Sequence, residues 1–396
     1  MPEIRTINLR SRRARKQVLL FPHRLYAGDP NWVPPRFHEQ MRTLDPRTGE
    51  FFTHGYGECF GAFENGTLRG TVCVAEDEYK NRITGLKDCI FGFFEYENDT
   101  AVFNALMNRA VSWAREHGLS RLIGPFNLDY ENNYGLVVEG EDRLPTMLCA
   151  YTKDYYLEHM RRWNFSEDRG RNLAFELDLS RPNGEMEKLF RLGDRLVSRS
   201  DLRVRGADFS DFENEVERIY YLINKSLAHI PDFKPWHRED LAKTLKEFKS
   251  FADPELILFA EIPRGSALSR NPENQPLIGG WEPVGWLPGL PNLNEYLVHT
   301  GGLRFPWQFI QLLALMRRQP RCLTIKSVLI PRNIGQRELV SVCSAGCFRL
   351  PSPGAIPGWT FLLHRKKTPT PRILQGVWVP GCIGPIRCSP WKYRTQ

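Results

Sequence analysis

The chain has 396 residues, with 54 Lys and Arg against 46 Asp and Glu, and a formal net charge of +8 at pH 7. This length predicts two domains, and a hydrophobic content of 41% is ample for packed cores. We see no signal peptide and no apolar run near 18 residues, so we expect a cytoplasmic protein that neither spans nor crosses a membrane and has no membrane partner.

The positive charge is concentrated at the C-terminal end. Residues 332–396 hold ten of the basic residues and one acidic residue, Glu338, which leaves 44 basic and 45 acidic residues in 1–331. The basicity is therefore a property of this tail. A nucleic-acid binder driven by the tail is the alternative that the net charge alone suggests, but the near-neutral body predicts no nucleic-acid partner.

The nine cysteines divide between the body and the tail. Those of the tail offer a zinc site as an alternative, but their Cys-x3-Cys and Cys-x5-Cys spacings are unusual for zinc, and we expect no metal. These residues are Cys343, Cys347, Cys382 and Cys388. The others mostly lie in apolar, strand-like runs and are predicted to be reduced core residues. They are Cys59, Cys73, Cys89, Cys149 and Cys322.

The N-terminal half begins with an arginine-rich stretch, 1–17, which predicts a solvated entry segment, with a phosphate-binding arm as the alternative. Prolines in 25–35 predict an extended, ordered loop. Asn65-Gly66 then predicts a tight hairpin between strands at 59–63 and 68–74. The spacing of apolar residues and the presence of helix-capping residues predict the other elements of this half. They are a strand at 88–95, a helix between Asp99 and Gly118, a strand at 121–125, a helix at 155–163 and a closing strand at 173–177.

A linker at 180–184 leads to the C-terminal half. Its predicted helices lie at 185–198, 212–227, 238–251 and 305–315, and its strands at 202–206, 256–261 and 282–286, with a long loop at 263–281. The last strand, 322–330, is apolar and is stopped by Pro331. The order of elements predicts an α/β fold with mixed strand directions.

Four stretches resemble a known bacterial family. They are LYAGDPNWVPP (25–35), FFTHGYGECFGAFENGTLRG (51–70), FGFFEYENDTAVFNALMNRAVSWAREHG (91–118) and GPFNLDYENNYGLVVEG (124–140). The family is that of GNAT-like proteins, related to the GNAT superfamily of acetyltransferases, and the resemblance covers nearly all of 1–331. It implies two tandem GNAT-like lobes with mixed, mainly antiparallel sheets flanked by helices, and an irregular C-terminal tail. We place the N-terminal lobe at 1–180, an incomplete C-terminal lobe at 185–331, and an aberrant tail rich in Pro, Cys and Arg at 332–396.

The resemblance also implies the substrates. The acyl donor is acetyl-CoA or another acyl-CoA, and the acceptor is an amine or other small molecule. Strand 322–330 resembles the strand whose backbone holds the pantetheine arm, which assigns the donor contacts to Ser327, Val328, Leu329 and Ile330. Glu261 and Glu295 are possible general bases, with surface roles as the alternative. No catalytic acid can be named.

The second lobe departs from the superfamily where the donor's phosphates bind. A turn of the pattern Arg-x-x-Gly-x-Gly holds the pyrophosphate there, but RNIGQR (332–337) has one glycine. If the coding sequence is read from the third base of each codon after Pro331, the displaced frame permits Tyr-Arg-x-x-Gly-Val-Gly at the expected place. It also permits a closing segment like that of the superfamily over 376–383. We infer that the tail is out of frame, which the nucleotide sequence tests.

The first lobe departs as well. An acidic stretch without glycine, YEND (96–99), follows its central strand, so this lobe is not predicted to hold CoA in the usual way. Its polar candidates for a substrate cleft, or alternatively caps and surface groups, are Glu95, Glu97, Asp129 and Tyr130. The sequence thus predicts a GNAT-type N-acyltransferase that is impaired in this chain. A non-catalytic interaction module or pseudoenzyme is the alternative, and the oligomeric state stays open.

Overall fold

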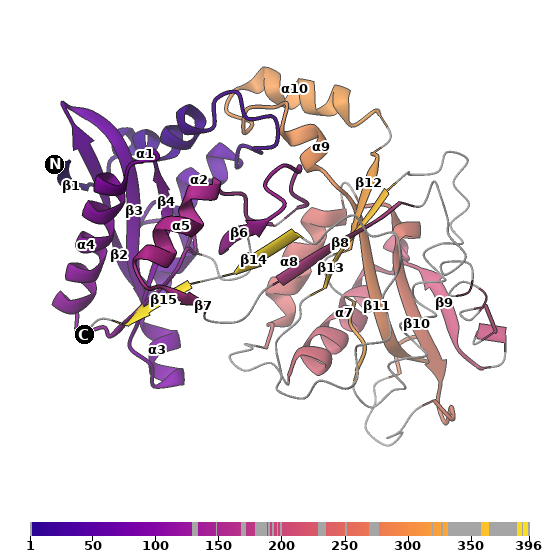
Figure 1. Cartoon of the computed structure of the whole chain (residues 1–396). Coiled ribbons are helices and arrows are strands. Elements are labelled where there is room, and N and C mark those ends of the chain that lie inside the picture. Colours follow the sequence, from indigo (N-terminus) through magenta and orange to yellow (C-terminus); the bar gives the residue numbers. More distant parts are fainter. Residues whose placement is uncertain are drawn as a thin grey trace.

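The computed structural model describes residues 2–128, 134–147, 149–167, 172–178, 188, 191, 194–195, 197–198, 200–228, 235–249, 252–268, 277–318, 320–325, 328–331, 358–363, 386–389 and 391–394. Two sheets, each flanked by helices, make up this part of the chain (Figure 1). No helix within it is long and apolar enough to cross a membrane.

The first sheet has the strand order β1-β2-β3-β4-β5-β15-β7. Its neighbouring strands are antiparallel except for the parallel pair β4 and β5. The strands are β1 Glu3–Ile7, β2 Gly55–Glu64, β3 Thr67–Asp77, β4 Asp88–Tyr96, β5 Arg121–Gly124, β7 Ser166–Glu167 and β15 Trp391–Arg394. The predicted hairpin is confirmed, because β2 and β3 meet at Asn65 and Gly66, whose φ angles of 49° and 76° are both positive.

Helices cover both faces of this sheet (Figure 1). Alternate residues of β2 point to opposite faces, so Phe60 packs in the cluster that contains α4, while Cys59 packs in the cluster that contains α1. Asp99 caps α4 through its side chain, as the sequence predicts. The helices are α1 Arg12–Leu25, α2 Phe37–Thr43, α3 Glu78–Thr84, α4 Thr100–Glu116 and α5 Asp154–Arg162, with a short 3-10 turn at Glu50–Thr53.

Helix α1 differs from the expected solvated entry segment. Ser11 caps it by accepting a hydrogen bond from the backbone of Ala14. Arg15 is buried, and its guanidinium lies 2.8 Å from the Asp45 carboxylate. The arginine-rich composition predicts a solvated segment, but residues 12–25 form a helix with a buried face. Arg15 can lie on that face because Asp45, 30 residues further along the chain, neutralises its charge.

The second sheet has the strand order β6-β14-β8-β13-β12-β11-β10-β9. Strands β12 and β13 are parallel neighbours, as β4 and β5 are in the first sheet. The strands are β6 Leu136–Glu139, β8 Asn172–Asp178, β9 Arg203–Gly206, β10 Ile257–Pro263, β11 Trp281–Pro291, β12 Cys322–Ile325, β13 Gly358–Leu363 and β14 Ile386–Ser389. The helices are α7 Phe212–Leu227, α8 Arg238–Lys249, α9 Asn294–Leu297 and α10 Pro306–Leu315, with 3-10 turns at Phe209–Asp211 and Pro254–Leu256.

The two sheets exchange segments of the chain. Strand β8, expected to close the first lobe, pairs in the second sheet with β13 and β14. In the tail, the described residues form β13, β14 and β15, and β15 lies between β5 and β7 of the first sheet (Figure 1). The lobe boundaries at 180 and 331 stay a prediction, because each sheet contains strands from both sides of them.

The cysteines differ in part from the sequence expectation. Cys59 and Cys73 occupy directly opposed positions of β2 and β3 and are paired as a disulfide in this structure, whereas the sequence predicts reduced residues. Cys89 is buried, Cys149 and Cys322 are half-buried, and none of these three belongs to a disulfide. Of the four tail cysteines, Cys388 lies in β14 and the other three lie outside the described residues.

Candidate functional site

Strand β4 contains a β-bulge near its C-terminal end. Thr71 of β3 pairs with Glu95, but Cys73 pairs with Gly92, so β4 has one extra residue between these pairs. Phe93 absorbs it with a positive φ of 43°, and its carbonyl accepts a hydrogen bond from the Thr71 hydroxyl at 2.9 Å. A bulge re-aims the side chains that follow it, and here it positions Glu95.

The chain itself occupies the edge of β4 that faces β5. The backbone N–H of Phe126 donates to the carbonyl of Phe91 at 2.7 Å. The N–H of Phe93 donates to Oδ1 of Asn127 at 2.6 Å. A Cβ added at Gly92 would lie 1.7 Å from the Phe126 carbonyl oxygen, so the two segments approach as closely as glycine allows.

Two tyrosines of α5 form hydrogen bonds with the backbone of β4 at its C-terminal end. The backbone N–H of Tyr96 donates to the Tyr156 hydroxyl at 3.1 Å. The carbonyl of Tyr96 accepts a hydrogen bond from the Tyr155 hydroxyl at 2.5 Å. Backbone groups of Phe91, Phe93 and Tyr96 on this strand are therefore already hydrogen-bonded within the chain. That the first lobe does not hold CoA in the usual way stays a prediction.

Glu95 follows the bulge of β4, and its carboxyl lies between Tyr156 of α5 and Tyr26. Its Oε2 accepts hydrogen bonds from the hydroxyls of Tyr156, at 2.7 Å, and Tyr26, at 3.2 Å. Burial raises the pKa of Glu95 to about 7, although these two hydrogen bonds favour the carboxylate. The side chain keeps partial contact with solvent. A carboxyl with a pKa near 7 and some access can take up and release a proton at neutral pH.

Aromatic rings and one ion pair surround this carboxyl. The ring of Tyr26 stacks on Trp32, with centroids 5.0 Å apart and planes inclined by 4°. The ammonium of Lys153 lies 4.8 Å from the Tyr26 ring centroid and donates to Asp29 at 2.7 Å. The loop at 25–35 thus forms one side of the site. Its prolines restrict the backbone to an ordered, extended path, and this path positions Tyr26 and Trp32.

The same region joins the two lobes. The Tyr151 hydroxyl donates to Asp29 at 2.9 Å, which ties the segment before α5 to the site. In that segment, the carbonyl of Pro145 accepts a hydrogen bond from the Asn294 side chain of α9 at 2.8 Å. Glu95 is therefore linked through short chains of contacts to the second lobe.

The other first-lobe candidates have ordinary roles or lie outside the described residues. Glu97 forms an ion pair with Arg69 at 2.9 Å and a longer one with Arg24, as a surface group does. Asp129 and Tyr130 lie outside the described residues. The residues that sequence reasoning missed are Tyr26 and Tyr156, which reach Glu95 from 69 and 61 residues away.

Glu261 lies at the centre of a buried ion-pair cluster. Its side chain is fully buried, and its carboxylate accepts hydrogen bonds from Arg205 and Arg218 at 2.9 Å each and from Arg203. Burial opposes ionisation, but the hydrogen bonds from Arg205 and Arg203 outweigh it and hold the pKa of Glu261 below its ordinary value. A carboxylate held in this way is a weak proton acceptor, so its geometry is that of a structural ion pair.

Glu295 lies in the first turn of α9 and is half-buried. Its Oε2 accepts a hydrogen bond from the backbone N–H of Arg321 at 2.8 Å, which fixes the entry to β12. The structure does not bring Glu295 and Glu261 together with Glu95 in any contact among the described residues, and each remains a separate candidate.

The predicted donor strand is shorter than expected. Strand β12 ends at Ile325, and Leu329 then pairs with Trp286, with N–H to carbonyl distances of 2.9 and 3.0 Å in the two directions. Because both backbone groups of Leu329 face β11, those of its neighbours Val328 and Ile330 face the other edge. Ser327 lies outside the described residues.

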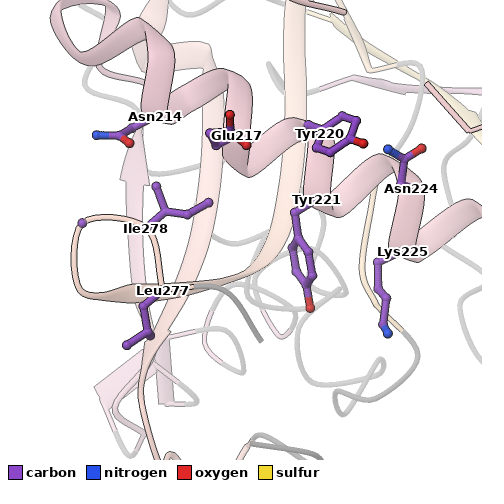
Figure 2. Close-up of a pocket in the computed structure, with 9 residues that line it drawn as sticks. Asn214, Glu217, Tyr220, Tyr221, Asn224, Lys225, Leu277 and Ile278 are labelled. Carbon is purple, nitrogen blue, oxygen red and sulfur yellow. The ribbon is translucent and has the colours of Figure 1, made fainter. Parts of the chain in front are cut away.

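A separate groove of about 560 Å³ lies against α7 (Figure 2). Tyr221 points toward it with a buried hydroxyl that has no partner in the described part of the chain, and burial followed by the charge of Glu282 raises the pKa of Tyr221 to about 12. None of the site residues predicted from the sequence is among those that line it. They are Asn214, Glu217, Tyr220, Tyr221, Asn224, Lys225, Leu277, Ile278 and Gly279. Within the described ranges, no group of three or more His, Cys, Asp or Glu could hold a metal ion.

Comparison with known proteins adds relatives at moderate distance. No family model matches the chain. Bacterial ceramide synthase from Caulobacter vibrioides is 28% identical over 320 residues, which cover 80% of this chain and 76% of that protein. Protein YghO of Escherichia coli is 25% identical over 301 residues, covering 75% and 71%.

Solved structures with a similar arrangement include a tandem GNAT protein from the clavulanic acid biosynthesis pathway, with a TM-score of 0.49, 10% identity, and coverage of 100% of this chain and 99% of that one. A GCN5-related N-acetyltransferase from Sphaerobacter thermophilus gives a TM-score of 0.48 at 10% identity, covering 100% and 96%. The chain is an α/β protein whose two sheets are flanked by helices, and it is similar in sequence to a bacterial ceramide synthase over 80% of its length.

Proposed function

We propose that this chain is a GNAT-type N-acyltransferase that moves an acyl group from an acyl-CoA to the amine of a long-chain, sphingoid-type acceptor. The observation that carries the proposal is Glu95, whose carboxyl accepts hydrogen bonds from the hydroxyls of Tyr156 and Tyr26 and whose pKa is raised by burial to about 7. The similarity to bacterial ceramide synthase supports this acceptor class, because a ceramide is the amide of a fatty acid and a sphingoid amine.

The chemistry assigned to Glu95 is general-base catalysis. The acceptor nitrogen attacks the thioester carbonyl, a C–N bond forms, and the C–S bond breaks to release the CoA thiolate, which takes up a proton. The carboxylate of Glu95 accepts the proton that the nitrogen loses. A base with a pKa near 7 suits this transfer better than an ordinary glutamate, since it holds the proton more firmly and is still largely ionised at slightly alkaline pH.

The donor is assigned to the second lobe. In the first lobe, groups of the chain itself pair the β4 backbone at Phe91, Phe93 and Tyr96. Strand β12 occupies the corresponding place in the second sheet, beside a parallel neighbour. We therefore assign the pantetheine contacts to the backbone edge around Val328 and Ile330 that is directed away from β11, and we keep acetyl-CoA or another acyl-CoA as the donor and the cytoplasm as the compartment.

The tail, residues 332–396, affects the rate of acyl transfer that we expect of this chain. The proposal retains the displaced reading frame after Pro331, because no in-frame turn with two glycines follows the donor strand. We expect the chain to transfer acyl groups more slowly than a version whose residues from 332 onward follow the displaced frame. Reading the gene around codon 331 tests this part directly.

The alternative function is a non-catalytic module with the same fold, and the occupied edge of β4 favours it for the first lobe. Thermal stabilisation by CoA separates the two functions. A rise in melting temperature at micromolar CoA supports the transferase, and no rise in either version of the tail supports the module.

The direct test is product formation. Both versions of the chain are incubated with long-chain acyl-CoA and a sphingoid amine, and the N-acyl product is measured by mass spectrometry. We expect Glu95→Gln to lower the rate by about 100-fold or more, the range of a lost general base. Glu295→Gln is the comparison variant, and a loss confined to it would move the base to Glu295.

A further inference from the structure

Helix α10 presents apolar side chains to solvent. Its ten residues, PWQFIQLLAL, include no charged residue, and none is buried. Trp307 is 60% exposed, Ile310 69% and Leu313 65%. A surface helix of a water-soluble protein usually turns such a face toward the core. An exposed apolar face of this kind indicates a binding surface for a partner or a membrane.

The polar residues of α10 face the protein instead. Oε1 of Gln308 accepts hydrogen bonds from the backbone N–H groups of Arg304, at 2.6 Å, and Phe305, at 3.1 Å. The amide of Gln311 donates to the carbonyl of His299 at 3.0 Å. The helix is thus fixed with its polar side inward and its apolar side outward, and stands at the top of the molecule in Figure 1.

Basic residues flank the exposed face. Arg304 precedes the helix, and Arg317, Arg318 and Arg321 follow it, all three of them exposed. Residues 296–337 contain no Asp or Glu. An apolar face with one arginine before it and three after it complements an apolar layer covered by anionic head groups.

The segment before α10 contacts the residues that follow the loop at 25–35, which contributes Tyr26 to the Glu95 site. The carbonyl of Gly302 accepts a hydrogen bond from Phe37 at 2.8 Å, directly after the loop at 25–35. Burial, followed by the charge of Arg304, lowers the pKa of His23 to about 4. The His23 ring packs edge-on against Trp32, at 5.1 Å between centroids, and Trp32 stacks on Tyr26. A surface bound by α10 is therefore connected to the candidate site.

We propose that α10 docks the protein onto an anionic membrane surface, with Trp307, Ile310 and Leu313 entering the boundary between head groups and acyl chains and the flanking arginines contacting the head groups. Membrane binding itself stands on the helix. Its purpose, access to a long-chain amine dissolved in the bilayer, rests on the proposed function.

The test is co-flotation of the full chain with vesicles of phosphatidylcholine alone or mixed with phosphatidylglycerol. We expect binding to the mixed vesicles that weakens with salt. Ile310→Ser with Leu313→Ser should lower partitioning about tenfold or more. Arg317→Gln with Arg318→Gln should lower it about fivefold per arginine. Ile83→Ser on α3, a residue 63% exposed, is the matched control and should change nothing.

Three results would overturn the proposal. The first is wild-type protein that stays with the unbound fraction, and the second is an α10 variant that floats as well as the wild type, with melting curves confirming that all variants fold. The third is a dimer that the α10 substitutions dissociate while no form binds vesicles, which would make a second copy the occupant.

The experiment separates this inference from the proposed function. Glu95→Gln should bind vesicles like the wild type, and the α10 variants should keep their turnover on a short-chain, water-soluble amine. Wild-type protein that forms product but does not float would refute only the docking role, and wild-type protein that floats but forms no product would refute only the proposed function.

Discussion

At the scale of single residues, the two lobes use buried carboxylates in opposite ways. Glu95 is surrounded by tyrosine hydroxyls and rings, and burial raises its pKa to about 7. Glu261 is surrounded by guanidinium groups, which hold its pKa below the ordinary value in spite of burial. The environment, and not the residue type, therefore shifts the two pKa values in opposite directions.

Glu95 should make the stability of the protein depend on pH. Because its pKa is higher in the folded state than in the unfolded state, the folded state binds more protons between pH 4.5 and about 7. The free energy of unfolding therefore falls as pH rises through this window and is constant above it. Denaturant unfolding at pH 5 and pH 8 should show a loss in the wild type that exceeds that of Glu95→Gln by about 1 to 2 kcal/mol. Equal losses would mean that Glu95 titrates normally.

Glu261 should matter for folding. Glu261→Gln leaves the guanidinium groups of Arg205 and Arg218 buried without their shared carboxylate, and we expect a loss of about 3 to 5 kcal/mol in unfolding free energy. Glu217→Gln is the matched control, because its pair with Arg238 is 40% exposed on both sides and should cost about 1 kcal/mol or less. Equal effects in denaturant titrations would contradict this account of the cluster.

At the scale of elements, strands β4 and β12 are equivalent in topology and differ in what covers their edges. Each lies beside a parallel neighbour. The edge of β4 is paired by residues 126–127 and by two tyrosines of α5. The edge beyond β12 leaves the backbone groups of Val328 and Ile330 directed away from β11, which is the difference on which the donor assignment depends.

Removing one backbone donor tests that assignment. Val328→Pro deletes the N–H on the edge directed away from β11 and leaves the Leu329 pairing with Trp286 in place. We expect CoA affinity to fall about fivefold, the worth of one hydrogen bond of about 1 kcal/mol. Isothermal titration with CoA measures this, and a melting curve confirms folding. Unchanged affinity in a folded variant would place the donor elsewhere.

The elements themselves were largely predictable from local signals. Asn65-Gly66 fixes a hairpin, and Asp99 and Gly118 bound a helix, because capping and turn preferences act within a few residues. Helix α1 escaped prediction since its burial depends on Asp45. The pKa of Glu95 escaped as well, because Tyr26 and Tyr156 reach it only through the tertiary fold.

At the scale of the whole molecule, the sheets are interleaved. Strand β8 comes from the N-terminal half and pairs in the second sheet, while β15 comes from the tail and pairs in the first. A sequence read for local period assigns a strand to its nearest neighbours, so it cannot detect such exchange. The absence of a long apolar run likewise excludes only spanning helices, and a ten-residue surface helix such as α10 passes that criterion unnoticed.

The central claim is that Glu95 accepts the proton of an amine during acyl transfer from CoA. The pH profile of kcat/KM for N-acylation of a sphingoid amine, measured for the wild type and for Glu95→Gln, tests it most directly. We predict a wild-type rate that rises through about pH 7, and a variant at least about 100-fold slower without that rise. A variant with the wild-type profile, or a wild type that forms no N-acyl product with either version of the tail, would contradict it.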